Sequence, residues 1–279
     1  MATYVTSDAH GHLRALDRAL SLAAPGPADT LFVLGDMVDR GPDPVGVIQL
    51  VRGIPGVRVL MGNHERMMLD ALLHDSDIDL GTWALNGGYA TAPGLDRLPR
   101  EEFSDIIDWI ANLPLYDVVE AGGRAFILAH AGIDALAARG YLATAGVDCS
   151  EGRGASSASR EQLMDMMAQQ DPQDLLWIRD RFWAEPTGLV GKDGSGPVVI
   201  AGHTPSTALG FYAQAGEGVG VSEDGRGMVT PLGACDATGG VADRVDIDCA
   251  AAGGHEMGRV GILRLDDGAT WYADVLEGE

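Results

Sequence analysis

The chain has 279 residues, enough for one large α/β domain or two small ones, and 46% of them are hydrophobic, as in ordinary globular proteins. Its 41 acidic residues outnumber 19 lysines and arginines, which gives a net charge of −22. This balance argues against a nucleic acid or an anionic membrane as the partner, because either polyanion would be repelled. A phosphate substrate would need a local positive centre, which bound metal ions could supply.

The cysteines and the apolar runs predict a location in the cell. Cys149, Cys235 and Cys249 form no C-x-x-C pair and leave one unpaired in any disulfide scheme, so we expect reduced thiols. No apolar run approaches the roughly 20 residues of a membrane span. Met1–His10 lacks the basic and apolar segments of a secretory signal. These features predict a cytoplasmic protein.

Short apolar runs alternate with segments of helical period in the first half of the chain, which predicts an α/β fold. The predicted elements, in chain order, are residues 2–7 (strand), 13–23 (helix), 30–34 (strand), 44–51 (helix), 57–61 (strand) and 65–74 (helix). A helical insertion follows at about 79–113, with a clear helix at 101–111 that ends before Pro114.

The second half is less regular. Its predicted elements are strands at 115–120 and 124–129, helices at 161–169 and 172–183, and strands at 198–201, 245–248, 259–265 and 270–275. Irregular insertions are expected at about 140–172, where 140–159 is weakly patterned, and at about 213–243, whose Gly-rich, Asp-rich composition is typical of a loop or flap. No repeat or linker divides the chain, so we expect a single domain over residues 1–279.

Polar residues follow five of the predicted strands. The clusters are Ser7-Asp8-Ala9-His10-Gly11, Gly35-Asp36-Met37-Val38-Asp39-Arg40-Gly41, Gly62-Asn63-His64-Glu65, Ala129-His130-Ala131-Gly132 and Gly202-His203-Thr204-Pro205. Ligands of open α/β sheets bind beyond the carboxyl ends of the strands, so the five clusters should meet at one site. A single histidine would more often be structural, but five such clusters in order are not accidental.

The chemistry of these side chains predicts bound metal ions. Asp8 and His10 are two residues apart, so an extended chain would turn both to the same side. Carboxylate, imidazole and amide ligands together suit Mn²⁺, Fe or Zn²⁺ better than a metal that prefers thiolates. Two ions are expected, because one cannot take all the candidates, which are Asp8, His10, Asp36, Asn63, His130 and His203. Two ions about 3.5–4 Å apart can bind one phosphate and lower the pKa of a bridging water.

The series of motifs resembles the phosphoprotein phosphatase family of calcineurin-like metallophosphoesterases, whose pattern is G-D-x-H-G, G-D-x-x-D-R-G, G-N-H-E, H-A/G-G and G-H-T-P. The resemblance is to the bacterial and phage lambda phosphatase branch and covers most of the chain, including the closing strand pair at 245–265. It implies a four-layer sandwich of two mixed β-sheets flanked by helices, with helical and loop insertions. The chain departs from the pattern where Ser7 replaces a glycine and where Asp248-Cys249-Ala250 replaces Asp-Thr-Gly.

The resemblance also implies a role for each site residue. One metal would bind Asp8, His10 and Asp36, and the other would bind Asp36, Asn63, His130 and His203. His64 would be the general acid for the leaving alcohol, with Asp39 holding its imidazole. Arg40 would bind the phosphate, together with the Asn63 amide and a second arginine. Arg179 is expected in that second position, 24 residues before the histidine of the Gly-His-Thr-Pro motif, and Arg181 is the alternative.

The implied reaction is direct attack of a metal-bridging hydroxide on phosphorus, without a phosphoenzyme. Protein phosphoserine or phosphothreonine is the first choice of substrate, because Asp39-Arg40-Gly41 and Gly62-Asn63-His64-Glu65 match the protein-phosphatase branch. The alternative is a dinucleoside polyphosphate, since the related diadenosine tetraphosphate hydrolases usually read G-D-x-V-A-R-G and G-N-H-D. A non-catalytic binding module is a third possibility, which the complete set of ligands disfavours.

The expected cofactors are two divalent metal ions, with Mn²⁺ as the first choice and Fe or Zn²⁺ as alternatives. The expected partner is a phosphorylated protein or a small phosphate ester, with no nucleic acid and no membrane. The sequence leaves the oligomeric state open.

Overall fold

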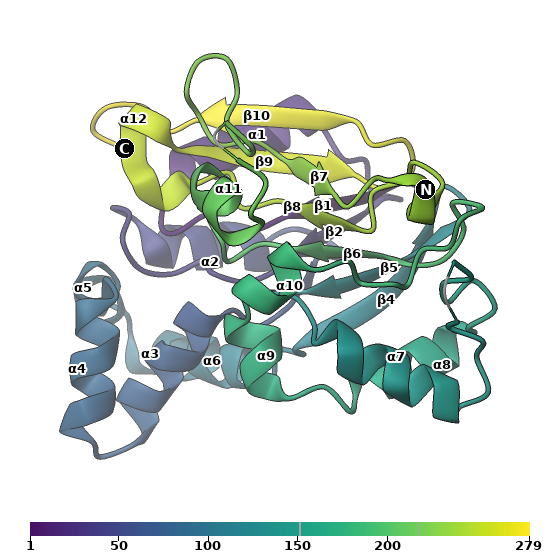
Figure 1. Ribbon diagram of the computed structural model, residues 1–279. Helices are drawn as coiled ribbons and strands as arrows, with labels where there is room; N and C mark the ends of the chain where they lie inside the picture. The colour runs from purple at the N-terminus through teal and green to yellow at the C-terminus, as the bar shows by residue number, and fades with distance from the viewer. Residues whose placement is uncertain (151, 217) are drawn as a thin grey trace.

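The computed structural model of the protein describes residues 1–150, 152–216 and 218–279. Two mixed five-stranded sheets pack face to face, with helices on their outer surfaces (Figure 1). The first sheet has the order β10-β9-β1-β2-β3 and consists of β1 (Thr3–Thr6), β2 (Thr30–Val33), β3 (Arg58–Val59), β9 (Arg259–Arg264) and β10 (Thr270–Asp274). The second has the order β4-β5-β6-β8-β7 and consists of β4 (Tyr116–Ala121), β5 (Arg124–Ala129), β6 (Val198–Ala201), β7 (Thr230–Leu232) and β8 (Arg244–Asp246). The predicted sandwich of two mixed sheets is confirmed.

The pairing directions decide where the site can form. Strands β1, β2 and β3 are parallel to one another, and so are β5, β6 and β8 in the other sheet. The edge strands β10, β4 and β7 pair antiparallel with their neighbours. The carboxyl ends of the central strands therefore lie at one edge of each sheet, and the loops that follow them can share a site.

The helices fall into two sets along the chain. The first half contains α1 (Leu13–Ala23), α2 (Pro44–Arg52), α3 (Asn63–Leu73), α4 (Asp77–Leu85), η1 (Gly88–Ala90), α5 (Ala92–Leu95) and α6 (Arg100–Ala111). The second half contains α7 (Ala135–Thr144), α8 (Arg160–Met167), α9 (Pro172–Trp177), α10 (Asp180–Ala184), η2 (Ser206–Ala208), α11 (Leu209–Tyr212), η3 (Asp236–Thr238), η4 (Ala251–Gly253) and α12 (Gly254–Met257). Helices α3 to α6 form an arm below the first sheet at the left of Figure 1.

Both faces of each sheet are buried, which explains why the strands are apolar runs with little alternation. Along β1, Tyr4 belongs to the apolar cluster beneath α1, whereas Val5 belongs to the cluster between the sheets. Other residues between the sheets are Phe32, Leu34, Leu128, Ile200 and Ile247. On the outer face of the second sheet, Ile127 packs with Met166 of α8 and Phe182 of α10.

Three segments differ from the sequence-based expectation. The helix expected at 172–183 is two short helices, because Ile178 is extended (φ −61°, ψ 139°) and α10 starts again at Asp180. The stretch expected to be irregular at 140–159 begins inside α7. The expected loop at 213–243 contains β7, which pairs with β8, so part of it belongs to the second sheet; residue 217 lies outside the described residues.

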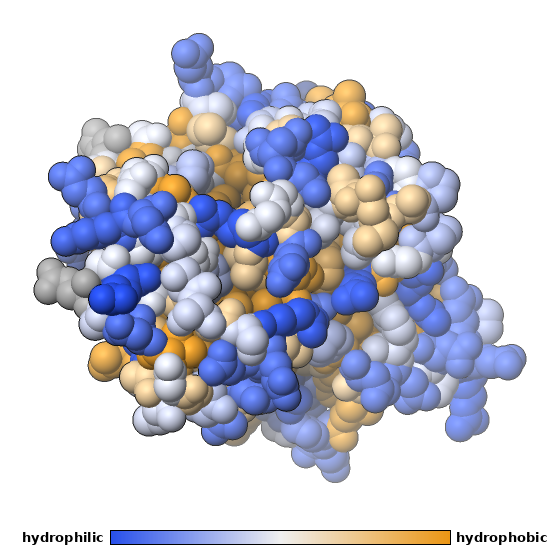
Figure 2. Space-filling model, turned by 90° about the vertical axis from the view of Figure 1, so that its right-hand side faces the viewer, coloured by the Kyte–Doolittle hydropathy of each residue, from blue (hydrophilic) through white to orange (hydrophobic). Residues whose placement is uncertain are grey.

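The surface carries both hydrophilic and hydrophobic residues. On the face shown in Figure 2, hydrophilic residues are interspersed with smaller hydrophobic areas. Among the helices of the described ranges, none is long and apolar enough to cross a membrane.

Candidate metal centre

The polar clusters that follow β1, β2, β3, β5 and β6 meet at one edge of the sandwich. The carboxylate of Asp36 lies at their centre. Its Oδ2 is 3.5 Å from His10 Nε2, and its Oδ1 is 3.4 Å from His130 Nε2. Asp36 therefore occupies the position between two ligand groups that was expected for a bridging carboxylate.

Asn63 joins the side chains of the second sheet to this centre. Its Oδ1 lies 2.8 Å from His130 Nε2 and 2.9 Å from His203 Nδ1. Asp8 lies on the other side of His203, whose backbone N–H donates to the Asp8 carboxylate at 3.1 and 3.2 Å. The structure thus brings together all the predicted ligands, which are Asp8, His10, Asp36, Asn63, His130 and His203, and all are buried.

Within the described residues, two groups of side chains place their ligand atoms within 4.8 Å of one another. One group is Asp36, His130 and His203, and the other is His10, Asp36 and His64. Asp36 belongs to both, as two ions with a shared ligand require. The second group contains His64, the predicted general acid, where the sequence predicted Asp8.

The donor set fits cations because lone pairs converge on the centre. His130 Nδ1 lies 2.7 Å from the Leu34 carbonyl and His10 Nδ1 lies 2.9 Å from the Val38 carbonyl, so each ring donates there and turns a bare Nε2 inward. His203 Nε2 is buried and has no hydrogen-bond partner among the described residues. A buried nitrogen without a partner is costly unless it binds an ion, so these atoms fit divalent metals.

The electrostatics of the centre also favour bound metal ions. Burial raises the pKa of Asp36 well above its usual range, and the neighbouring Asp8 and Glu65 raise it further. Burial lowers the pKa of His10 and of His203 well below the usual range. The centre therefore contains several buried carboxylates and few compensating cations, a combination that bound metal ions would stabilise.

The backbone reaches this geometry through sharp turns. Asp8, His10, Asp36 and His203 all have positive φ angles, of 53°, 42°, 53° and 67°. The expectation of an extended chain from Asp8 to His10 is therefore wrong. Left-handed geometry costs of order 1 kcal/mol or more at each such residue, and hydrogen bonds such as His10 N–H to the Asp36 carbonyl (2.9 Å) hold it in place.

The predicted general acid has the expected partners. His64 Nδ1 donates to Asp39 Oδ2 at 2.7 Å, and Arg40 Nη2 lies 3.2 Å from His64 Nε2. Arg179 Nη2 donates to the His203 carbonyl at 3.3 Å, beside the ligands. The alternative, Arg181, is exposed and forms ion pairs with Asp134 and Asp174. The helix break at Ile178 and Arg179 thus places Arg179, and not Arg181, next to the centre.

Residues 1–257 match the profile of the family described as calcineurin-like phosphoesterase. The chain belongs to this family. The resemblance that the motifs suggested is therefore confirmed, and the clusters around Asp36 contain side chains that could hold metal ions.

Curated relatives of this phosphoesterase are named bis(5'-nucleosyl)-tetraphosphatase, symmetrical. The protein of Erwinia tasmaniensis is 32% identical over 136 residues, which cover 48% of this chain and 45% of the relative. The protein of Serratia proteamaculans is 32% identical over 139 residues, which cover 48% of this chain and 44% of the relative. The match thus spans less than half the length of these relatives.

Solved structures support the fold of this phosphoesterase. A structure described as a candidate diadenosine tetraphosphatase has a TM-score of 0.56 at 17% identity and covers 99% of this chain and 94% of that one. A metallophosphoesterase from Sphaerobacter thermophilus has a TM-score of 0.51 at 18% identity, covering 99% and 88%.

Several buried residues of the phosphoesterase support the centre without having been assigned a role from the sequence. The Glu65 carboxylate accepts the backbone N–H groups of Asp36, Met37 and Gly62 at 2.8, 2.8 and 3.0 Å. Its place three residues after the helix N-cap is the one local signal that could have revealed it. Further buried residues interact with predicted site residues: Trp83 and Thr91 with Asp39, and Asp246 and Asp248 with Asp8.

Gly202, the glycine of the Gly-His-Thr-Pro motif, has no side chain and so leaves room for the carboxylate of Asp8, a predicted metal ligand. A Cβ at Gly202 would overlap the Asp8 carboxylate and the Ser7 hydroxyl. Gly202→Ala should therefore displace Asp8 and lower metal occupancy and turnover together, measured by elemental analysis and a phosphatase assay. Gly140→Ala is the matched control, because a Cβ there meets open space. Full occupancy and turnover in Gly202→Ala would contradict the close approach.

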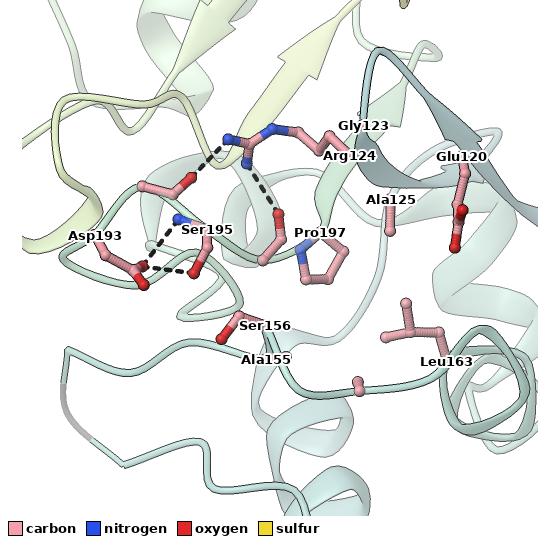
Figure 3. A pocket seen from close by; sticks show the side chains of 13 residues that line it. Glu120, Gly123, Arg124, Ala125, Ala155, Ser156, Leu163, Asp193, Ser195 and Pro197 are labelled. Carbon is pink, nitrogen blue, oxygen red and sulfur yellow. Dashed lines mark hydrogen bonds between the residues drawn. The ribbon is translucent and has the colours of Figure 1, made fainter.

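A cavity of about 510 Å³ lies far from this centre (Figure 3). It opens at the start of β5 and β6, at the opposite ends of these strands from His130 and His203. Its arginine, Arg124, donates to the carbonyls of Gly194 and Gly196 at 2.6 and 2.9 Å, as Figure 3 shows. The guanidinium is thus occupied by backbone, and the cavity is separate from the metal centre.

Proposed function

We propose that this phosphoesterase hydrolyses phosphate monoesters with poor leaving groups, and that its substrates are phosphoserine or phosphothreonine residues of proteins. The observation that carries the proposal is the buried pair of Asp39 and His64, joined at 2.7 Å beside Arg40. A serine or threonine oxygen leaves readily only when it receives a proton. A leaving polyphosphate is already stable as an anion near neutral pH and gains much less from an acid.

Two divalent ions, when bound, would supply charge for the phosphoryl oxygens and lower the pKa of a water so that it can act as the nucleophile. The residues proposed to hold them are Asp8, His10 and Asp36 on one side and Asp36, Asn63, His130 and His203 on the other. We propose Mn²⁺ as the native metal, with Fe and Zn²⁺ as alternatives, and the cytoplasm as the location.

The phosphate itself would lie between Arg40 and Arg179, on either side of the centre. Each guanidinium offers planar N–H donors to phosphoryl oxygens, and the Asn63 amide offers another. An open cavity of about 510 Å³, lined by Trp177, Arg179 and Tyr212, adjoins the centre through Arg179, which donates to the His203 carbonyl. It leaves room for the part of the substrate beyond the phosphate.

His64 needs a proton on Nε2 to serve as the acid. Burial lowers its pKa to about 3, and the Arg40 guanidinium adds to this effect. A phosphate bound by Arg40 would offset that positive charge and raise the pKa, because nearby negative charge favours the imidazolium. Asp39, on the other ring nitrogen, favours the imidazolium for the same reason. Substrate binding and proton delivery are thereby linked.

A second candidate is the symmetrical cleavage of a dinucleoside polyphosphate. The names of the curated relatives favour it, although the match spans less than half of each relative. Asp39 distinguishes the candidates, because an anhydride substrate has little use for a histidine acid held by a buried carboxylate.

The metal-loaded protein should therefore hydrolyse phosphoserine and phosphothreonine peptides with a higher kcat/KM than diadenosine tetraphosphate. We expect a preference of about tenfold or more, the smallest difference that one well-used interaction of about 1.4 kcal/mol provides. Both substrates are assayed under one metal condition, and metal-dependent turnover of either excludes a non-catalytic binding module. A preference for the dinucleotide would overturn the proposed substrate in favour of the second candidate.

A further inference from the structure

The carboxylate of Asp39 is enclosed by donors, two of which come from the helical insertion. Trp83 Nε1, on α4, lies 2.9 Å from Oδ1 and 3.1 Å from Oδ2. Thr91 Oγ1, at the start of α5, donates to Oδ1 at 2.6 Å. His64 Nδ1 donates to Oδ2 at 2.7 Å. All four residues are at most 2% exposed, so water does not compete for these bonds.

We propose that Trp83 and Thr91 are positioning residues for the general acid: they fix the Asp39 carboxylate, which in turn fixes the His64 ring. The inference rests on the proposed function, in which His64 supplies the proton. An ionised carboxylate is only an acceptor, and one orientation satisfies three donors at once. With Oδ1 held by the insertion, Oδ2 faces His64 and keeps the ring from turning.

Thr91 also holds the backbone of this segment. Its Oγ1 accepts the Asp39 N–H at 2.9 Å while it donates to the carboxylate of the same residue. Asp39 and Arg40 have φ angles of 70° and 68°, which L-residues adopt only when their surroundings impose it. The Gly87 carbonyl accepts the Arg40 N–H at 3.3 Å. The insertion therefore holds both the acid's partner and the phosphate-binding arginine.

A purely structural role for Trp83 predicts something different. A buried indole N–H needs an acceptor, and any carbonyl of the arm would satisfy it. Here the acceptor is the carboxylate that binds His64. The two roles separate when the N–H is removed and the ring volume is largely kept, because packing then survives and the orientation of Asp39 does not.

Trp83→Phe removes the N–H donor, and Thr91→Val removes the hydroxyl at nearly constant volume. For an alkyl phosphate, we expect kcat to fall about 10- to 100-fold in each variant, the order of loss that follows misplacement of a reacting group. KM should change less than about twofold and metal content should not change, because neither residue touches the phosphate or a ligand. For p-nitrophenyl phosphate, whose leaving group needs little acid help, the fall should be much smaller.

Matched controls are Trp109→Phe and Thr82→Val. Trp109 lies on α6 with Arg52 over its ring, and Thr82 donates to the Ile78 carbonyl at the surface of α4. Both controls should keep wild-type kcat on both substrates. An equal loss of kcat on the alkyl and nitrophenyl esters in Trp83→Phe and Thr91→Val would show a structural role and overturn the inference.

A second readout does not depend on turnover. In the zinc-loaded protein, the proton on His64 Nδ1 should give a downfield NMR resonance from its bond to Asp39, assigned by its absence in His64→Asn. Trp83→Phe and Thr91→Val should shift or broaden this resonance, and the controls should not. An unchanged resonance in both variants would overturn the inference. If wild type hydrolyses no monoester, the proposed function fails, and the resonance still decides whether Trp83 and Thr91 orient the pair.

Discussion

Asp36→Asn should reduce turnover by about 10³-fold or more and lower the metal content below two ions per chain. Asp36 is the one residue found in both ligand groups, so its charge would serve both of the proposed ions. Metal ions contribute several kcal/mol to phosphoryl transfer, and each 1.36 kcal/mol corresponds to a factor of ten. Turnover is measured with a phosphate monoester, and metal content by elemental analysis of the purified protein.

Asp17→Asn is the control for this change, because Asp17 is an exposed carboxylate on α1 that belongs to neither ligand group. It should keep full activity and two ions. A chelator added to wild-type protein should reproduce the loss of turnover, and added Mn²⁺ should restore it. Two tightly bound ions together with wild-type turnover in Asp36→Asn would show that Asp36 does not bridge them.

His64→Asn should lower turnover of an alkyl phosphate by roughly 10²- to 10⁴-fold, the contribution of a positioned acid. The loss should shrink for p-nitrophenyl phosphate, because nitrophenol leaves without a proton. The metal content should remain at two ions, since the proposed ligand next to it is Asn63. His74→Asn is the control, because His74 is an exposed residue at the end of α3.

The metal content of His64→Asn also distinguishes a general acid from a metal ligand. His64 Nε2 lies 3.9 Å from Asp36 Oδ2, within the same group of ligand atoms as His10. A histidine that bound a metal would cost an ion when replaced, and its loss would affect good and poor leaving groups equally. That outcome would assign His64 to the metal and leave the acid unidentified.

The sequence predicted the fold where its physical signals are local. Helix α1 was placed at its observed ends, and β5 and β6 also match, because period and apolar runs report burial directly. The break at Ile178 was missed, because the segment from Pro172 to Trp183 keeps a helical composition throughout. Strand β7 was missed because three residues carry too little pattern for a strand to be recognised.

In the site, too, the sequence predicted the features that short local motifs encode and missed those that they do not encode. The predicted ligands occur in short motifs directly after strands, so the rule for carboxyl ends of strands was enough to bring them together. The turns at Asp8 and His10 could not be predicted, because the positive φ angles of these two residues cannot be read from the amino-acid composition. Trp83 and Thr91 lie 44 and 52 residues from Asp39, in an insertion for which the sequence predicted only helical structure.

The proposed ligands come from both sheets, so bound ions would also hold the two sheets together. Asp8, His10, Asp36 and Asn63 follow strands of the first sheet, whereas His130 and His203 follow strands of the second. Asp8 and the His203 backbone that it contacts are 195 residues apart in the chain. Ions held by this set would cross-link the two sheets at the edge where the ligands meet. The cross-link would close a long stretch of chain, and closing such a loop costs conformational entropy. Metal uptake would then follow the formation of both sheets, because the proposed ligand set is complete only when the two sheets have met.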